Sequence, residues 1–212
     1  MATQQNQSYK KSSIYTRTGD DGTSSLYNGE RVSKTKRIIK VLGGVDEINS
    51  ALGMCKFIKV ISAGVVKAHW KDQVEPWQLQ NKGATEIIEQ IQHELMKLSS
   101  DIATPIRSSS PEKREKVNFP LNLVENLEKM IDEMDAKLPK LTTFILPGGS
   151  ITTASIHQVR AICRRTELGL VKLAAQEPVN EAISMYINRL SDFLFVFARS
   201  SAYYFKDCEI KH

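Results

Sequence analysis

Arginines with helical spacing form the first group of residues that could do chemistry. Arg160 and Arg164 are four residues apart and Glu167 follows three later, so in a helix the three share one face, with Arg165 beside them. Guanidinium groups bind phosphate oxygens in pairs and stay charged at any working pH. The pattern fits a polyphosphate site. Taken alone, it fits even better a solvated basic face with an intrahelical salt bridge.

A glycine- and hydroxyl-rich segment, residues 14–34, forms the second group. Its glycines let neighbouring N–H groups converge on an anion. Hydroxyl and basic side chains could complete a phosphate cradle: Thr16, Arg17, Thr18, Gly19, Gly22, Thr23, Ser24, Ser25 and Lys34. The spacing is not GxxxxGK[ST], and no strand leads directly into a helix here. A plain surface loop is therefore the alternative interpretation.

Charged residues inside an apolar C-terminal segment form the third group. Asn188, Arg189, Asp192 and Arg199 lie among aromatic and aliphatic residues that predict a buried helix. Buried charges are paired or bind something. Arg189 and Asp192 are three residues apart, so mutual pairing and ligand binding are both open.

The histidines, cysteines and tryptophans are weaker candidates. His69 and His157 lack metal-ligand spacing, and a polar or capping role is expected for both. Trp70 and Trp77 are expected to pack rather than stack on bases. The three cysteines lie far apart, so isolated reduced thiols are expected rather than a disulfide framework or zinc site: Cys55, Cys163 and Cys208.

Apolar residues at helical spacing predict the elements that position these groups. Helices are expected from about residue 35, over 78–103, 120–138, 151–176 and 179–205. Residues 62–77 are expected to form an inter-helix loop and 108–116 a solvated, mobile linker. Strand patterns are limited to short runs near Ile14 and Phe144. The fold class is therefore an all-α bundle of about five helices.

Composition predicts a single folded domain. The 212 residues carry a net charge of +5, which suits either nucleic acid or an anionic small ligand. We expect a disordered leader at 1–13, one helical domain at 14–206 and a tail at 207–212. No apolar run approaches the roughly 20 residues of a membrane span. The polar N-terminus has no secretion signal, which favours the cytoplasm, or the mitochondrial matrix if a transit peptide has been removed.

Six motifs, in order along residues 14–203, resemble the PduO-type ATP:cob(I)alamin adenosyltransferases. Each motif is modest, but their shared order is specific. The motifs are YTRTGDDGT at 15–23, GERVSK at 29–34, GVDEINS at 44–50, FILPGG at 144–149, RAICRRTE at 160–167 and YINRLSD at 186–192.

The resemblance implies a ferritin-like five-helix bundle that assembles as a homotrimer, with active sites between neighbouring subunits. It implies transfer of the 5′-deoxyadenosyl group of ATP to the cobalt of cob(I)alamin, with release of triphosphate and Mg²⁺ bound with ATP. A corrinoid reductase and an adenosylcobalamin-dependent acceptor enzyme are the implied partners.

The resemblance also implies roles for individual residues. ATP would contact Thr16, Arg17, Thr18, Gly19, Thr23, Lys34, Arg164, Arg165, Glu167 and Asn188. The residues with catalytic roles would be Arg160, Arg164, Asp46 and Phe144. Asp46 and Arg160 would form an ion pair across the subunit interface, and Phe144 would lie against the corrin and exclude its lower axial ligand. Family members often have lysine where this chain has Asp21. At this position a phosphate contact is therefore expected from the backbone rather than from the side chain.

Two alternatives come from other functional classes. A basic helical module that binds nucleic acid or a partner protein would explain the net charge, but not the glycine-hydroxyl loop. An ATP-binding carrier or sensor without turnover would keep the same binding residues. Cob(I)alamin is itself the nucleophile in the adenosyl transfer, so that reaction needs no Ser, Cys or His nucleophile, and the sequence offers no evident one.

Overall fold

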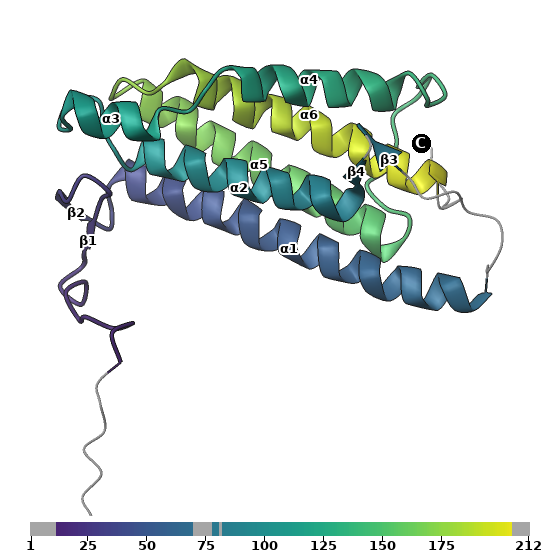
Figure 1. Ribbon diagram of the computed structural model, residues 1–212, viewed down its shortest axis with the longest axis horizontal. Coiled ribbons are helices and arrows are strands. Elements are labelled where there is room, and N and C mark those ends of the chain that lie inside the picture. The colour runs from purple at the N-terminus through teal and green to yellow at the C-terminus, as the bar shows by residue number, and fades with distance from the viewer. Residues whose placement is uncertain (1–11, 70–77, 81, 205–212) are drawn as a thin grey trace, which may run out of the picture.

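The computed structural model describes residues 12–69, 78–80 and 82–204. Five long helices lie lengthwise beside one another, as Figure 1 shows. They are α1 (Arg37–His69), α2 (Ala84–Ile102), α4 (Asn122–Asp135), α5 (Ile151–Ala174) and α6 (Glu181–Tyr204). The predicted five-helix bundle is confirmed. No helix among the described residues is both long and apolar enough to cross a membrane.

Helix α5 packs against both α1 and α6, which places its predicted site residues between two neighbours. Gly44 of α1 lies so close to α5 that a Cβ atom there would come 2.6 Å from Oγ1 of Thr166. Gly169, one turn further along α5, lies against Val41, one turn earlier on α1. The two helices therefore run antiparallel, and α5 begins at the end of the bundle opposite to the start of α1.

Apolar stripes on the helices form one continuous core. On α2 the apolar stripe is buried from Ala84 to Ile102, and on α4 the buried residues are Val124, Leu127, Met130 and Met134. Helix α6 is buried on most of its circumference, as its composition predicts, and its rings Phe193 and Phe197 stack at 5.4 Å. The charged Arg199 is buried there because it donates a hydrogen bond to the carbonyl oxygen of Pro139 at 2.8 Å.

Two small antiparallel ribbons correct the all-α prediction. β1 (Thr23–Ser25) pairs with β2 (Arg31–Ser33), and β3 (Gln78–Leu79) pairs with β4 (Lys82–Gly83). The helix expected at 78–103 therefore begins at Ala84, whereas Ile14 and Phe144 lie in irregular backbone. Strands of two or three residues are too short to show the alternation by which a strand is recognised.

Helix α1 is longer than the sequence predicts. Residues 62–69, expected in a loop, continue α1 to His69, while residues 70–77 with Trp70 and Trp77 lie outside the described residues. Residues 56–69 contain no proline, and their single glycine, Gly64, costs a helix only about 1 kcal/mol relative to alanine. The polar side chains of residues 62–69 therefore do not end the helix.

A short helix, α3 (Pro111–Val117), occupies most of the expected linker at 108–116. Its sequence carries the signals of a helix start. The Ser110 side chain accepts a hydrogen bond from the backbone N–H of Lys113, and Pro111 occupies the first turn, where a missing N–H costs nothing. Helix α4 is also shorter than predicted, beginning at Asn122 and ending at Asp135. Residues 1–11, Cys208 and the tail lie outside the described residues.

Candidate functional site

The N-terminal segment folds into a compact turn followed by the β1–β2 ribbon. Lys34, just after β2, donates its Nζ to the carbonyl oxygen of Gly19 at 2.8 Å, and its backbone N–H donates to the carbonyl of Gly22 at 2.8 Å. Thr16 and Thr18 share a hydroxyl hydrogen bond of 2.8 Å. Gly22 has φ 81°, a conformation that favours glycine. The turn thus gathers most of the predicted loop residues.

Arg31 holds this turn from the β2 side, and sequence reasoning missed it. Its guanidinium donates to the carbonyl of Thr18 and to the hydroxyl of Thr23, and it lies 3.4 Å from the Asp21 carboxylate. Asp21 also accepts from the Thr23 hydroxyl at 2.6 Å and backbone N–H at 2.9 Å. These bonds, the hydroxyl bond first, hold the pKa of Asp21 below its usual value. In the sequence, this arrangement is signalled by the two-residue spacing of Asp21 and Thr23, which is the spacing of an Asx turn.

Arg17 is the strained residue of the turn. It has φ 61°, and its guanidinium lies 5.7 Å from the centre of the exposed Tyr15 ring. A positive φ is uncommon for a non-glycine residue and is concentrated at functional sites. Its side chain is exposed, so it is available to an anion.

The arginines of α5 have different surroundings. Arg165 donates to Glu47 of α1 at 2.5 Å, which raises its pKa above the usual value. Arg164 is exposed and makes no hydrogen bond or ion pair with any residue in the described part of the chain. Arg160 is half-buried, with its guanidinium 5.4 Å from the centre of the Phe195 ring. Of these three cations, Arg164 is the one presented to solvent without a partner among the described residues.

Glu167 joins α5 to α6. Its Oε1 accepts a hydrogen bond from Nδ2 of Asn188 at 2.8 Å. The intrahelical salt bridge that was the simpler interpretation of residues 160–167 is absent from the described contacts. On α6, Arg189 and Asp192 pair at 3.2 Å, which is one of the two possibilities left open by the sequence, and Arg189 also reaches Glu128 at 2.9 Å. Arg189 is therefore a structural residue, whereas Glu167 and Asn188 present polar groups beside Arg164.

Phe144 and Asp46 are both exposed in the single chain. Phe144 has 91% of its surface exposed, and Leu146 and Ile151 nearby have 47% and 72%. Large exposed apolar patches are typical of interaction sites, so these three side chains are candidates for contact with a ligand or another chain. Behind them lies a small hollow lined by Ile145, Leu146, Gly148, Thr153, His157, Ala198, Arg199 and Ala202. Asp46 has no partner among the described residues, so it does not pair with Arg160 inside one chain.

The predicted residues fall into groups at different places along the bundle. The β1–β2 hairpin lies at the end where α1 begins (Figure 1). Phe144 precedes α5, which starts at the opposite end, and a helix of 24 residues spans about 36 Å. One chain therefore does not bring its own hairpin and its own Phe144 to one small ligand.

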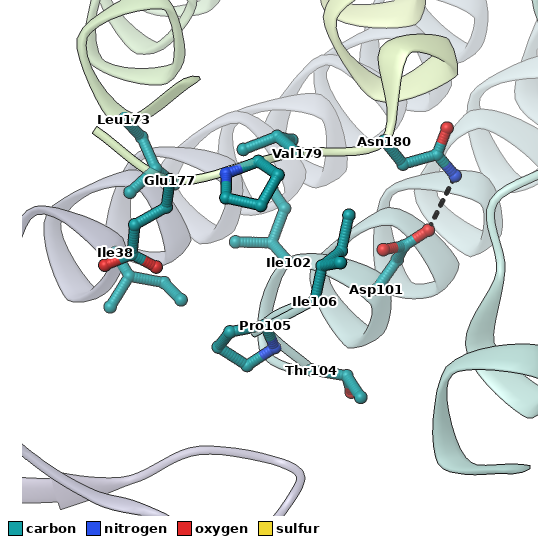
Figure 2. Close-up of a pocket in the computed structure, with 11 residues that line it drawn as sticks. Ile38, Asp101, Ile102, Thr104, Pro105, Ile106, Leu173, Glu177, Val179 and Asn180 are labelled. Carbon is teal, nitrogen blue, oxygen red and sulfur yellow. Dashed lines mark hydrogen bonds between the residues drawn. The ribbon is translucent and has the colours of Figure 1, made fainter. Parts of the chain in front are cut away.

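A second pocket lies near the hairpin end, between the end of α2 and the α5–α6 connection (Figure 2). Ile38, Ile102, Ile106 and Val179 make it largely apolar. Of its two carboxylates, Asp101 and Glu177, the first is already occupied: Oδ2 of Asp101 accepts from Nδ2 of Asn180 and from the backbone N–H of Phe119, both at 2.8 Å. None of the predicted site residues lines this pocket.

Neither of the two described cysteines is an activated thiol, and the described residues contain no metal-binding cluster. Burial raises the pKa of Cys55 to about 11 and that of Cys163 to about 12, so both stay protonated at neutral pH. No group of three or more His, Cys, Asp or Glu residues in the described ranges could hold a metal ion.

Comparison with known proteins identifies the family. Residues 14–201 match the family model described as cobalamin adenosyltransferase. The chain is 37% identical to the cobalamin adenosyltransferase of Cupriavidus metallidurans, over 89% of this chain and 87% of that protein. It is 35% identical to the corrinoid adenosyltransferase MMAB of Bos taurus, over 89% of this chain and 71% of that protein.

A solved structure agrees with these sequence relatives. It is a variant of a PduO-type ATP:corrinoid adenosyltransferase from Lactobacillus reuteri complexed with cobalamin and ATP. The TM-score is 0.76 at 27% identity, covering 94% of this chain and 98% of that one. The match of the family model, together with the ordered motifs and the helical bundle, shows that this chain belongs to the cobalamin adenosyltransferase family.

Proposed function

We propose that this protein transfers the 5′-deoxyadenosyl group of ATP to the cobalt of cob(I)alamin. The products are adenosylcobalamin and triphosphate. The observation that carries the proposal is the face around Arg164: an exposed guanidinium without a described partner, beside the paired Glu167 and Asn188, in a chain whose family binds a nucleotide and a corrinoid.

The chemistry needs alignment more than acid–base catalysis. The cobalt electron pair attacks the ribose C5′ atom, the C5′–O bond breaks, and triphosphate leaves with the bonding electrons. The protein must align cobalt, carbon and oxygen and must stabilise the charge on the leaving group. Arg164, Lys34 and the backbone N–H groups around Gly19 are suited to that charge. Both described cysteines are protonated, in keeping with a nucleophile that belongs to the substrate.

The remaining ATP contacts are proposed on the same grounds. Thr16, Thr18 and Thr23 present hydroxyls on one turn, with Arg17 exposed next to them. Asn188 and Glu167 offer an amide and a carboxylate for the nucleoside. Arg165 donates a hydrogen bond to Glu47 and so connects α5 to α1. We propose that it contacts phosphate only if it releases Glu47.

Phe144 is proposed to lie against the corrin. An apolar ring occupies the space where a water or a base nitrogen would otherwise bind the lower face of cobalt. Without that axial ligand, cobalt is more easily reduced to the nucleophilic state. The 91% exposure of Phe144 in the single chain supports this role, because a ring so exposed gains most from covering by a ligand or subunit.

A homotrimer is proposed as the functional unit, with each site between two chains. The hairpin and Phe144 lie at opposite ends of one chain, so a site containing both needs more than one chain. Asp46 and Arg160 are proposed to pair across the interface, since Asp46 has no partner among the described residues.

Mg²⁺ is proposed to be bound mainly by phosphate oxygens. The described residues provide no cluster of three carboxylate, histidine or cysteine ligands, so they do not fit a metal cage made by the protein alone. Mg²⁺ in nucleotide sites commonly keeps several waters and relies on substrate phosphates. We assign no step of the reaction to the ion.

The wider context is also proposed. A corrinoid reductase would supply cob(I)alamin and an adenosylcobalamin-dependent enzyme would accept the product. The cytoplasm or, for a processed form, the mitochondrial matrix would be the compartment. Residues 1–13 and 207–212 are proposed to lie outside the single catalytic domain at 14–206.

Product analysis tests the proposed function. The purified protein is incubated with ATP, Mg²⁺ and chemically reduced cobalamin, and corrinoid and phosphate products are separated. Stoichiometric adenosylcobalamin and triphosphate are expected. ADP or pyrophosphate in place of triphosphate, or salt-sensitive nucleic-acid binding with no adenosylcobalamin, would refute the proposal.

A further inference from the structure

The tip of the β1–β2 hairpin is tied to a distant part of the chain by five side chains, which we name the hairpin clamp: Asn28, Glu30, Ser108, Ser109 and Lys113. Nδ2 of Asn28 donates to Oγ of Ser109 at 3.0 Å and to Oγ of Ser108 at 3.2 Å. Oγ of Ser108 donates to Oε2 of Glu30 at 2.6 Å. Nζ of Lys113 donates to the backbone carbonyl of Asn28 at 2.9 Å. The clamp thus links residues about 80 positions apart.

Hydrogen bonds continue from the clamp into the turn that is proposed to bind ATP. The clamp holds the tip between β1 and β2, and β2 carries Arg31. Arg31 holds Thr18 and Thr23, and Lys34, just beyond β2, holds Gly19. A movement of the clamp would therefore move the phosphate-binding groups of the turn.

Apolar anchors already attach the hairpin to the bundle without the clamp. Leu26 and Val32 have only 5% and 3% of their surface exposed and belong to the main core. The backbone N–H of Tyr27 adds a bond to the carbonyl of Ala103 at 2.9 Å. Two adjacent apolar contacts fix where the hairpin sits but allow it to tilt. The polar contacts at its tip are directional and restrict that tilt.

We infer that the hairpin clamp positions the N-terminal turn for ATP, so that its members are positioning residues for the adenosyl transfer. The inference rests on the proposed function. The hydrogen bond from the Ser108 hydroxyl is the largest of the effects that together lower the pKa of Glu30, so the carboxylate of the clamp stays charged at neutral pH. Lys113 lies on α3, which gives that short surface helix a role in the site.

The expected change in ATP affinity depends on the fraction of molecules whose N-terminal turn is in the conformation that binds ATP. When only part of the population is competent, the apparent dissociation constant rises by the inverse of that fraction. Loss of one charged hydrogen bond, such as that of Lys113, is expected to raise the KM for ATP about tenfold. Turnover at saturating ATP should change less than about twofold, because bound ATP restores the turn.

Lys113→Ala and Asn28→Ala test the inference in the full-length protein, with Lys116→Ala as the matched control. Lys116 is also an exposed lysine on α3, but no described contact joins it to the hairpin. ATP KM, cobalamin KM and turnover are measured, together with hydrogen exchange of residues 14–34 without ATP. Both variants should raise the ATP KM and the exchange of the turn, and Lys116→Ala should do neither. Lys113→Arg, which keeps a cationic donor, should restore most of the ATP affinity.

The outcomes separate the two proposals. An unchanged ATP KM and unchanged exchange in both variants would overturn the positioning role, even if the wild-type protein makes adenosylcobalamin. If the wild-type protein makes none, the proposed function fails. The role of the clamp in adenosyl transfer fails with it, and exchange of the turn then tests whether the clamp orders the turn: equal exchange in Asn28→Ala and the wild type would overturn that ordering, and raised exchange would support it. Circular dichroism confirms that each variant keeps its helices.

Discussion

At the scale of single residues, Arg164 differs from two other arginines of the bundle because it has no partner among the described residues. Two other arginines form ion pairs: Arg165 with Glu47 at 2.5 Å, and Arg189 with Glu128 at 2.9 Å. Arg164 has no such partner among the described residues. Its charge is available to a ligand, whereas the charges of Arg165 and Arg189 mainly connect helices.

Arg164→Ala should therefore lower turnover much more than stability. Loss of a charged contact to a leaving triphosphate costs about 3 kcal/mol or more in transition-state stabilisation, so kcat/KM should fall about a hundredfold or more. The free energy of unfolding should change by less than about 0.5 kcal/mol, because the side chain is exposed. Steady-state kinetics and urea unfolding measure both. Near-normal kcat/KM would show that phosphate binds elsewhere.

Asp21 gives the turn a defined pH dependence. Because its pKa in the folded protein lies below the usual 3.8, the charged carboxylate stabilises the turn above that pH, and the contribution is lost as pH falls through the lower value. Thr23→Val removes the hydroxyl that contributes most, so the Asp21 pKa should rise toward 3.8. NMR titration of the carboxyl carbon, assigned with Asp21→Asn, measures the shift. An identical midpoint in Thr23→Val and wild type would contradict the hydrogen bonds described.

At the scale of elements, the contact between α1 and α5 positions the arginine face. The two backbones approach closely at Gly44 because Thr166 fills the space where a side chain would be. In the sequence, the glycines of this segment are visible as interruptions of the helical pattern, consistent with either close helix packing or ligand approach. The partner residue on α5 needed the three-dimensional structure.

Gly44→Ala and Gly43→Ala form a matched pair that tests this contact. A Cβ at Gly44 would lie 2.6 Å from Oγ1 and 3.0 Å from Cγ2 of Thr166, whereas one at Gly43 would meet nothing within 4 Å. Overpacking costs about 1–3 kcal/mol, so Gly44→Ala should destabilise the fold by about 1 kcal/mol or more, net of its better helix propensity. Gly43→Ala should stabilise it by about 0.5–1 kcal/mol. Urea unfolding measures both, and equal effects would contradict the helix contact.

The sequence predicted the helices with strong apolar stripes and missed the elements that depend on tertiary contacts. The stripe from Ala84 to Ile102 follows directly from periodicity. The β1–β2 ribbon depends on Leu26 and Val32 reaching the bundle core, which a local pattern does not show. The site followed the same division. Arg164 and Glu167 were evident from spacing, but the pairing of Glu167 with Asn188 and the contribution of Arg31 depend on distant segments.

At the scale of the whole molecule, we propose that the site is shared between two chains. The hairpin beside the turn is anchored at the α2–α3 connection, and no described hydrogen bond joins the turn to the arginines of α5 in the same chain. Asp46 is exposed, and Arg160 is only half-buried under Phe195. An ion pair between Asp46 of one chain and Arg160 of another would give each charge a partner.

Arg160→Ala should weaken the assembly as well as the activity. Breaking a partly buried ion pair at an interface costs about 2 kcal/mol or more, so the trimer should dissociate at higher protein concentration than in the wild type. Sedimentation velocity at a series of concentrations measures this, and Asp46→Ala should give a similar shift. An unchanged trimer with full activity in both variants would contradict the assignment.

Mixed trimers test the central claim, that the turn of one chain and Arg164 of another act on one ATP. Lys34→Ala and Arg164→Ala chains, each inactive alone, are unfolded together, refolded at equal amounts and assayed for adenosylcobalamin and triphosphate. Random mixing leaves an intact turn facing an intact arginine at about one interface in four, so about a quarter of wild-type turnover is expected. No recovery above the separate variants, in trimers confirmed to be mixed, would contradict a site shared between chains.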